Sequence, residues 1–203
     1  MRGEVLTVWD WFFPARRKRT REGLPSIDVS TTADFYKVFT SPNPVLSATI
    51  HNIAGDQVGT ARYSISPLSD RVYVFDIRIA PHHQRHGYGT AMLCYLAKEY
   101  GQPITPIHEV ESANEFWGAA RRYRGAGLSV TEDISISEMA LEATRWQHLA
   151  PIAECLDKLI TRRLRVDREP WHVAVGRGFG AEDNGDAATS GPAISDDSNT
   201  VRT

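Results

Sequence analysis

The residues with the clearest chemical potential lie in one short loop, Gln84-Arg85-His86-Gly87-Tyr88-Gly89. The loop follows a run of β-branched and aromatic residues and precedes an amphipathic stretch, so it should lead from a strand into the first turn of a helix. Backbone N–H groups at the start of a helix lack partners within the helix and attract anions. Glycine at two positions lets the backbone approach a phosphate without an intervening Cβ. The loop therefore predicts a site for a pyrophosphate group.

A dinucleotide-binding fingerprint is one alternative for this loop, and its spacing does not fit. That fingerprint needs the pattern G-x-G-x-x-G directly after the strand and an acidic residue about 20 positions later. This loop has only Gly87 and Gly89. A second alternative, a loop that only caps a helix, stays open on the glycines alone.

The segments before the loop have the pattern of strands. Residues 45–53 and 57–65 are rich in β-branched side chains and are joined by Ala54-Gly55-Asp56, which predicts an antiparallel hairpin. Residues 71–80 then predict a central strand that ends at Pro81. Its alternation predicts a fully apolar face and a mixed face, made respectively of Tyr73, Phe75, Ile77 and Ile79 and of Val72, Val74, Asp76 and Arg78.

The segments after the loop have mainly helical spacing. Met92, Leu93, Leu96, Ala97 and Tyr100 share one helix face, and Gly101 stands where a helix commonly ends. The elements expected next are an edge strand over residues 102–107, a helix over residues 114–123, a weakly alternating segment over residues 128–136, and helices over residues 137–165 divided at Pro151.

The loop resembles the Q/R-x-x-G-x-G/A signature of the GNAT superfamily of N-acetyltransferases, and it stands where that family has it, between the fourth strand and the third helix. Ile79-x-Pro81 and Ala91-x-Leu93 also fit the family pattern. The resemblance extends from Val45 to about Leu128. It implies an α/β (α+β) fold with a mixed, mostly antiparallel central sheet flanked by helices, and this chain adds a helical C-terminal extension.

The resemblance also implies acetyl-CoA as co-substrate, held between the strand that ends at Ile79 and the strand near residues 104–107. Strand, Pro81, motif and helix together favour this over a simple helix cap. In the family the pantetheine arm pairs with the fourth strand, and the pyrophosphate binds amides of the loop. The expected cofactor-binding residues are Ile77, Arg78, Ile79, Gln84, Arg85, His86, Gly87, Tyr88, Gly89 and Thr90. Arg85 and His86 can add positive charge or be ordinary exposed loop residues.

The reaction that the resemblance implies is direct attack of a primary amine on the thioester. An amine with a pKa of about 10.4 must lose a proton, and a thiolate with a pKa of about 8.5 leaves more easily with a proton donor. The family commonly uses a tyrosine four residues before a Gly-Phe pair, and Tyr123 precedes Gly127-Leu128 by four. A second register, with Phe116-Trp117 in the aromatic positions, and a packing role for Tyr123 both stay open.

The general base is less defined, because Tyr73 stands where the histone-modifying branch has a glutamate. Asp76 is the candidate in the fourth strand; with Arg78 it can position an amine or form an ion pair. Other candidates are His83, His108, Glu109 and Glu111, and a base acting through water is equally compatible. Cys94 is expected to be a small buried side chain. The spacing of Cys and His predicts no metal site.

The acceptor cannot be identified from the sequence. In the family two helices between the first and second strands help to wall the acceptor side, whereas residues 11–44 contain four prolines, the basic segment Arg16–Arg21 and one short helix-like piece, residues 33–39. The C-terminal extension can cover the site, form a dimer or pack as a helical lobe. Its expected buried stripe is Trp146, Leu149, Ile152, Leu156 and Leu159.

Composition bounds the class of protein. The chain has 203 residues, 41% hydrophobic and 24% charged, with a formal net charge of -2. We expect a globular cytoplasmic protein with no membrane span and no electrostatic reason to bind nucleic acid. The expected parts are an N-terminal strand and basic segment (1–44), an acetyl-CoA-binding core (45–136), a helical extension (137–175) and a disordered acidic tail (176–203).

The resulting hypothesis is an N-acetyltransferase that uses acetyl-CoA and an unidentified amine acceptor. Two alternatives are a catalytically lapsed module that binds acyl-CoA and a tRNA-directed acetyltransferase. The second rests only on the segment Arg16–Arg21. A homodimer remains open.

Overall fold

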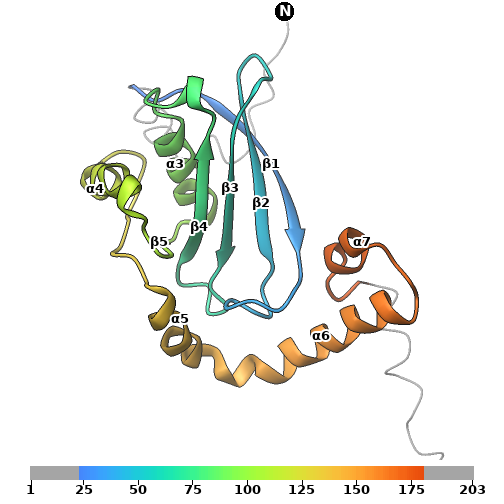
Figure 1. Cartoon of the computed structure of the whole chain (residues 1–203). Helices are drawn as coiled ribbons and strands as arrows, with labels where there is room; N and C mark the ends of the chain where they lie inside the picture. The colour runs from blue at the N-terminus through green and yellow to red at the C-terminus, as the bar shows by residue number, and fades with distance from the viewer. Residues whose placement is uncertain (1–22, 181–203) are drawn as a thin grey trace, which may run out of the picture.

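The computed structural model describes residues 23–180, which form one five-stranded sheet and the helices around it (Figure 1). The sheet order is β1-β2-β3-β4-β5. Neighbouring strands are antiparallel except β5, which is parallel to β4. This confirms the mixed, mostly antiparallel sheet. The strands are β1 (Ile27–Asp34), β2 (Val45–Asn52), β3 (Gln57–Ile65), β4 (Val72–Ile79) and β5 (Ile104–Pro106).

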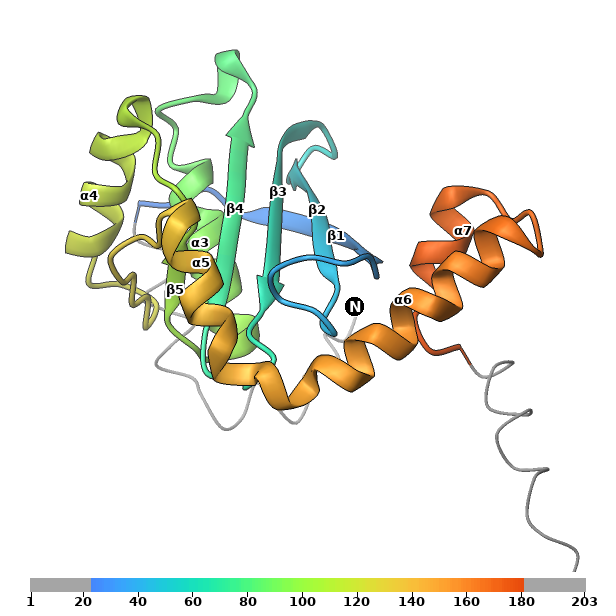
Figure 2. The same cartoon turned by 60° about the horizontal axis from the view of Figure 1, so that its bottom comes forward.

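Helices flank the sheet and continue after it. The helix α3 packs on one face of the sheet, while α5 and α6 run along the end where β3 finishes and β4 begins, and α7 lies beside β1 (Figures 1 and 2). The helical elements are η1 (Pro81–His83), α3 (Tyr88–Tyr100), η2 (Glu111–Ala113), α4 (Asn114–Arg122), α5 (Ile136–Ala143), η3 (Thr144–Leu149), α6 (Ala150–Arg165) and α7 (Trp171–Gly176).

The main core lies between the sheet and α3. Its helix contributes Met92, Leu93 and Leu96, all fully buried, as their helical spacing predicts. The helix ends at Gly101, which has a φ of 67° and whose N–H donates to the Ala97 carbonyl. The predicted helix and its glycine cap are therefore confirmed.

A bulge in β4 changes the face on which its side chains lie. Arg62 pairs with Asp76 but the next residue, Tyr63, pairs with Val74, so Phe75 has no opposite residue. Val72, Val74, Ile77 and Ile79 consequently pack in the core with α3, whereas Tyr73 and Phe75 join a second cluster around Trp146. The predicted grouping of Tyr73, Phe75, Ile77 and Ile79 on one face is therefore wrong, because strict alternation does not survive an unpaired residue.

Three other expectations differ from the structure. Residues 33–39 are not a helix, because β1 continues to Asp34 and the residues that follow lead into turns. Residues 128–136 form no regular strand but only two isolated bridges, Ile104 to Val130 and Ile107 to Ile134. The C-terminal helices are divided at Trp146, which has non-helical φ and ψ angles, rather than at Pro151, which fits the first turn of α6.

The C-terminal extension is fastened to the end of β1. The Phe35 N–H donates to the Val175 carbonyl at 2.8 Å, and Leu156, Ile160 and Val175 form a small buried cluster. The buried guanidinium of Arg163 donates to the carbonyls of Ala174 and Gly178 at 3.1 and 2.8 Å, and these carbonyls lie at the end of α7. Of the expected stripe, Trp146 and Leu156 are buried but Ile152 is exposed.

No helix within residues 23–180 is long and apolar enough to cross a membrane. The basic segment Arg16–Arg21 and most of the acidic tail, from residue 181 onward, lie outside the described residues.

A charged network attaches α5 and η3 to the start of β4. The Tyr73 hydroxyl donates to Glu142 at 2.6 Å, and Arg145 donates to Glu142 at 2.5 Å and also to Asp70. Burial by itself raises the pKa of Glu142, but the bonds from Tyr73 and Arg145 and the nearby arginines outweigh burial and leave the pKa below its usual range. The network therefore stabilises the fold while Glu142 is ionised.

We predict that Glu142→Gln lowers the free energy of unfolding at pH 7 by about 1–3 kcal/mol, since a charge-assisted bond is lost in a partly buried site. A depressed folded-state pKa gives stability that is present above the unfolded pKa of about 4.3 and is lost as the pH falls through the folded value. The difference in the free energy of unfolding between wild type and variant, measured by urea unfolding, should therefore be smaller at pH 3 than at pH 7. An equal difference at both pH values would contradict the role given to the carboxylate.

Candidate functional site

One edge of β4 has no strand beside it over its second half. The pairing between β4 and β5 covers only Val72 to Val74, and the Ile107 N–H donates to the Val74 carbonyl at 2.9 Å just beyond it. The Ala80 N–H donates to Val58 of β3, so by alternation the backbone groups of Ile77 and Ile79 point away from β3. Among the described residues, these groups line an open sheet edge that an extended ligand can pair with.

The first residue of the sequence motif holds the loop against this strand. The Gln84 side-chain nitrogen donates to the Ile79 carbonyl at 3.0 Å. Arg85 and Gly87 follow with φ angles of 63° and 85°, so the chain turns sharply back before α3 begins. Gln84 is thus a positioning residue: it occupies one carbonyl of the open edge and fixes the path of the loop.

The start of α3 is open to an anion. Gly87 is the N-cap residue, no side chain caps the helix, and its first turn contains no acidic residue. The first bond within the helix that involves Gly87 runs from the Ala91 N–H to the Gly87 carbonyl. The preceding N–H groups, of residues 88–90, have no acceptor within the helix and form the positive end of its dipole. This arrangement agrees with the predicted anion cradle.

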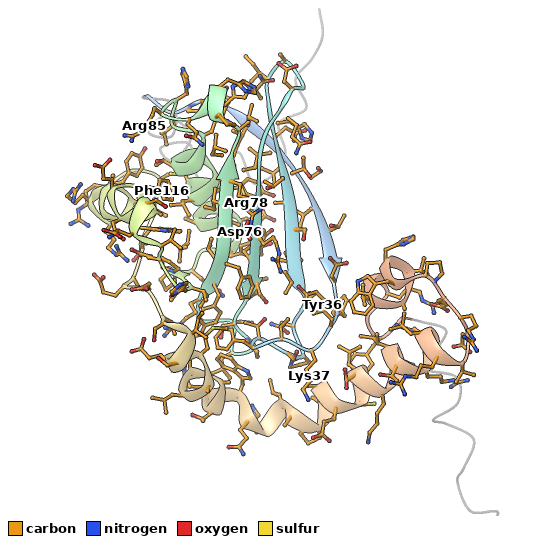
Figure 3. All side chains as sticks on the ribbon, viewed as in Figure 1. Tyr36, Lys37, Asp76, Arg78, Arg85 and Phe116 are labelled. Carbon is orange, nitrogen blue, oxygen red and sulfur yellow. The ribbon has the colours of Figure 1, made fainter. Side chains whose placement is uncertain are left out.

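The two glycines of the loop are required by their own neighbours. A Cβ on Gly89 would lie 2.9 Å from the Phe116 ring. A Cβ on Gly87 would lie 3.2 Å from Leu24 and 3.1 Å from Pro25, and its φ angle disfavours other residues. Phe116 and Arg85 are labelled in Figure 3. The glycines therefore allow α4 and the chain before β1 to pack against the loop, a reason that the sequence argument did not contain.

The charged residues of the loop lie at its rim. Arg85 and His86 are exposed, and the Arg85 guanidinium stands 3.6 Å from the Glu115 carboxylate with both side chains almost fully in solvent. Such an exposed pair is weak and can exchange for a ligand phosphate. His83 stacks between His82 and Tyr88 and so packs within the loop.

Tyr123 stands directly after α4 and contacts the middle of α3. Its hydroxyl makes a hydrogen bond with the Cys94 thiol, and its ring covers Gly125, where a Cβ would lie 2.5 Å from the hydroxyl oxygen. Burial and the Cys94 contact raise the pKa of Tyr123, and burial raises the pKa of Cys94 to about 11. Tyr123 therefore keeps a proton to donate at neutral pH, and the buried Cys94 thiol stays protonated, as expected.

Phe116 and Trp117, the aromatic pair of the alternative register, have packing roles in the structure. Trp117 is buried in the main core, and Phe116 packs against Gly89 and against Trp117 with ring centroids 4.9 Å apart. Both side chains thus hold α4 against α3.

Asp76 lies on the face of the sheet opposite α3. Its carboxylate lies 3.6 Å from Arg78 and 3.7 Å from Arg62, which confirms the expected ion pair with Arg78 and adds a second one (Figure 3). Ile77 and Ile79 pack toward α3, so Asp76 and Arg78 face away from it. Asp76 therefore lies on the face opposite α3, whereas Tyr123 packs against the core on the α3 side.

Of the other carboxylate and imidazole candidates, Glu109 has a side-chain partner. Glu109 pairs with Arg121, which also donates to the Thr131 carbonyl at 3.1 Å and so ties the segment after β5 to α4. The His108 N–H donates to the Ile134 carbonyl, and Glu111 begins η2. Within residues 23–180 no group of His, Cys, Asp or Glu side chains is arranged to hold a metal ion.

Sequence reasoning missed Arg62 and Tyr36, which complete the surface around Asp76. Arg62 is the cross-strand neighbour of Asp76 and donates to the Tyr36 hydroxyl at 3.1 Å. Arg62 could be predicted as the neighbour of Asp76 only from the pairing register of β3 and β4, which includes the bulge. No local pattern indicates Tyr36, which follows β1.

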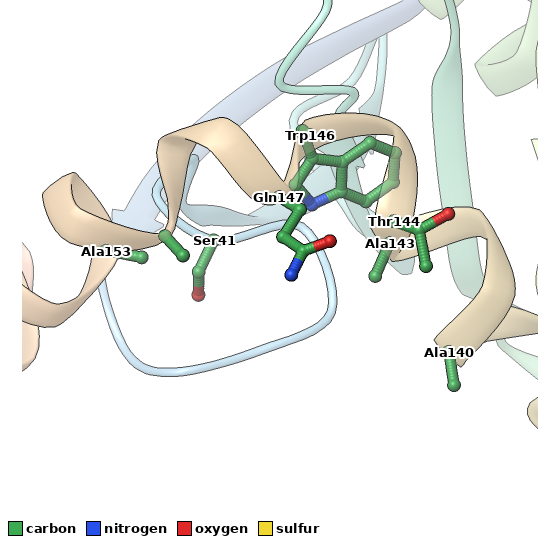
Figure 4. A pocket seen from close by; sticks show the side chains of 8 residues that line it. Ser41, Ala140, Ala143, Thr144, Trp146, Gln147 and Ala153 are labelled. Atoms are coloured by element: carbon green, nitrogen blue, oxygen red, sulfur yellow. The ribbon is translucent and has the colours of Figure 1, made fainter.

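Two hollows lie on the described surface. One, of about 460 Å³, follows the ends of β3 and β4 beside the loop and is lined by Gln57, Gly59, Thr60, Arg78, Ile79, Ala80 and Pro81. The other, of about 340 Å³, lies between η3, its neighbouring helices and Ser41, with Trp146 at its base (Figure 4). Only the first borders the open edge of β4.

One solved structure and one family model are similar to this chain. A solved structure of nourseothricin acetyltransferase is 22% identical in sequence, with a TM-score of 0.25, and the match covers 49% of this chain and 68% of that one. No curated protein sequence matches. The family model described as the acetyltransferase (GNAT) family matches residues 6–115, more than half of the chain, and ends within α4 after spanning the open edge and the anion cradle. The chain therefore belongs to the GNAT acetyltransferase family.

Proposed function

We propose that the protein transfers an acetyl group from acetyl-CoA to a primary amine. The observation that carries this proposal is the pairing of two unsatisfied backbone surfaces at one loop, the open edge of β4 and the uncapped start of α3. Acetyl-CoA has an extended pantetheine arm with amide groups and a pyrophosphate at its end. Its chemistry matches the two surfaces in that order.

The cofactor-binding residues follow from this match. The backbone of Ile77 and Ile79 pairs with the pantetheine amides, while the N–H groups of residues 88–90 bind the pyrophosphate. Arg85 and His86 at the rim add positive charge. Gln84 and Gly87 hold the loop in place rather than contact the ligand, while Gly89 leaves room for the Phe116 ring and also contributes its N–H.

The transfer is a single displacement on the thioester. The amine nitrogen forms a bond with the acetyl carbon, the carbon–sulfur bond breaks, and the departing thiolate takes a proton from the Tyr123 hydroxyl. The amine arrives as an ammonium ion, which Asp76 holds at the edge of β4 until its first proton passes to water. After the attack the nitrogen loses a second proton to water, and the Tyr123 phenolate regains a proton from water. The Tyr123 hydroxyl is protonated at neutral pH, so its proton is present when the thiolate leaves.

A lapsed member that binds acyl-CoA without chemistry is the second candidate function. It is favoured by one observation, the absence of an acidic residue at Tyr73, whose hydroxyl is engaged with Glu142. Acetyl-CoA binding without transfer to any amine separates it from the first proposal. The tRNA-directed alternative has no support within the described residues, because its basis lies outside them.

We predict that Thr90→Pro weakens acetyl-CoA binding by about 10- to 100-fold, the effect of one lost charge-assisted hydrogen bond. The substitution removes an N–H that the first turn of α3 does not use itself, so helix and fold should persist. Thr90→Ala keeps the N–H and is the matched control. Calorimetric titration with acetyl-CoA measures both, with circular dichroism as the test of folding. Equal affinity of the two variants for acetyl-CoA would show that the pyrophosphate does not bind at the start of α3. A folded wild-type protein that binds no acetyl-CoA would contradict the proposed function.

We predict that Tyr123→Phe lowers kcat by about 10²- to 10⁴-fold, the usual contribution of a general acid, and leaves the Kd for acetyl-CoA unchanged. Tyr100→Phe is the control, because Tyr100 is a half-buried tyrosine bonded to Tyr63 and not to the site. Release of the CoA thiol reports the rate. A Tyr123→Phe protein with wild-type kcat would assign Tyr123 to packing only.

A further inference from the structure

Three charged side chains meet on the sheet face opposite α3. Arg62 of β3 and Arg78 of β4 each face a different carboxylate oxygen of Asp76, at 3.7 and 3.6 Å (Figure 3). Both distances exceed those of a normal hydrogen bond, so the carboxylate closes a tight pair with neither guanidinium. Two positive groups and one negative group leave the cluster with one uncompensated positive charge.

The cluster differs from the other charged network of the protein. Around Glu142, donors and acceptors stand 2.5 to 2.6 Å apart and join two structural elements. Here the pairs are loose, and 49% of the Arg62 side chain and 79% of the Arg78 side chain are exposed. Such a pairing adds little to stability, which leaves the guanidinium groups available to a ligand.

The cluster also stands beside the point of transfer. Asp76 immediately precedes Ile77, whose backbone faces the open edge, and Arg78 lies between Ile77 and Ile79. Successive residues of a strand are about 3.3 Å apart, so a group held by Asp76 lies next to the pairing positions of the edge. The acceptor would enter from this face, and the cofactor is held from the face that α3 covers.

We propose that Arg62, Asp76 and Arg78 bind the acceptor and select amines that carry an anionic group, a carboxylate or a phosphate, within a few bonds of the nitrogen. Asp76 holds the ammonium, and the two guanidinium groups hold the anion, for which their planar donors are suited. Each arginine stands within 4 Å of Asp76. The ammonium and the anionic group of the ligand must therefore also lie close to each other. A free amino acid has this charge arrangement. The inference rests on the proposed function, since it assumes that an amine reacts at this edge.

Aromatic side chains continue the same row toward the C-terminal extension. Arg62 donates to the Tyr36 hydroxyl, which fixes the direction of the guanidinium. The Tyr36 ring lies 6.3 Å from the ring of Trp171, which begins α7 and is 58% exposed. An acceptor bound at Asp76 therefore has polar contacts at the reacting end and an apolar wall further along.

The test compares amines that differ only in the anionic group. The pairs are lysine with cadaverine, phenylalanine with 2-phenylethylamine, and phosphoethanolamine with ethanolamine, and kcat/KM is measured by thiol release from acetyl-CoA. We expect at least a tenfold preference for the charged member in the carboxylate pairs, the phosphate pair or both, and the pairs that show it identify the anion. Arg62→Gln and Arg78→Gln should reduce that preference through KM. Arg165→Gln, an exposed arginine of α6, removes the same charge elsewhere and should leave it unchanged.

Three outcomes overturn parts of this account separately. Turnover of the uncharged amines at equal or higher kcat/KM overturns the inference and leaves the proposed function standing. Binding of acetyl-CoA with no turnover of any amine overturns the proposed function. In that case calorimetry on the CoA-saturated protein still decides the subsite: a wild type that binds the zwitterions no more tightly than the two arginine variants do overturns the inference as well.

Discussion

The parting of β4 and β5 after Val74 is the constraint on which the site depends. β5 is short because Pro103 precedes it and Pro106 ends it, and neither proline has an N–H to give to a neighbouring strand. The Val74 carbonyl accepts a hydrogen bond from the Ile107 N–H. After Ile107 the chain leaves β4 and makes its contacts with Ile134 and Arg121 instead. Within residues 23–180, the second half of β4 thus has no strand beside the backbone groups of Ile77 and the N–H of Ile79, and an extended ligand can satisfy them.

The bulge at Phe75 gives the two faces of this strand different chemistry. Without the extra residue, Ile77 would not share a face with Val74, and the apolar contact with α3 would end halfway along β4. With it, the core side continues to Ile79, while Asp76 and Arg78 emerge on the other face. One local irregularity thereby separates the face closed by α3, to which we assign the cofactor, from the charged face, to which we assign the acceptor.

The sequence predicted what is encoded locally and missed what depends on distant partners. Alternation and turn residues placed β2, β3 and α3 closely, and Gly101 marked the end of α3, because these features depend on neighbours along the chain. The bulge depends on the register in which Arg62 and Tyr63 pair with β4, and the sequence of one strand does not contain that register. The sequence identified the loop glycines as important. It could not show their contacts with Phe116 and Leu24, because those residues lie far from the loop along the chain.

The C-terminal extension takes a place that the family resemblance gave to other helices. In the family two helices between the first two strands help to wall the acceptor side, and the sequence predicted no such wall for this chain. In the structure β1 and β2 are joined by residues 35–44, which form turns without a helix. Next to that connection stands α7, fixed by the Phe35 to Val175 bond, with Trp171 beside Tyr36. A wall built from the far end of the chain can change while the sheet, the loop and α3 stay the same. In the proposed function, the residues assigned to the acceptor are thus physically separable from those assigned to the cofactor.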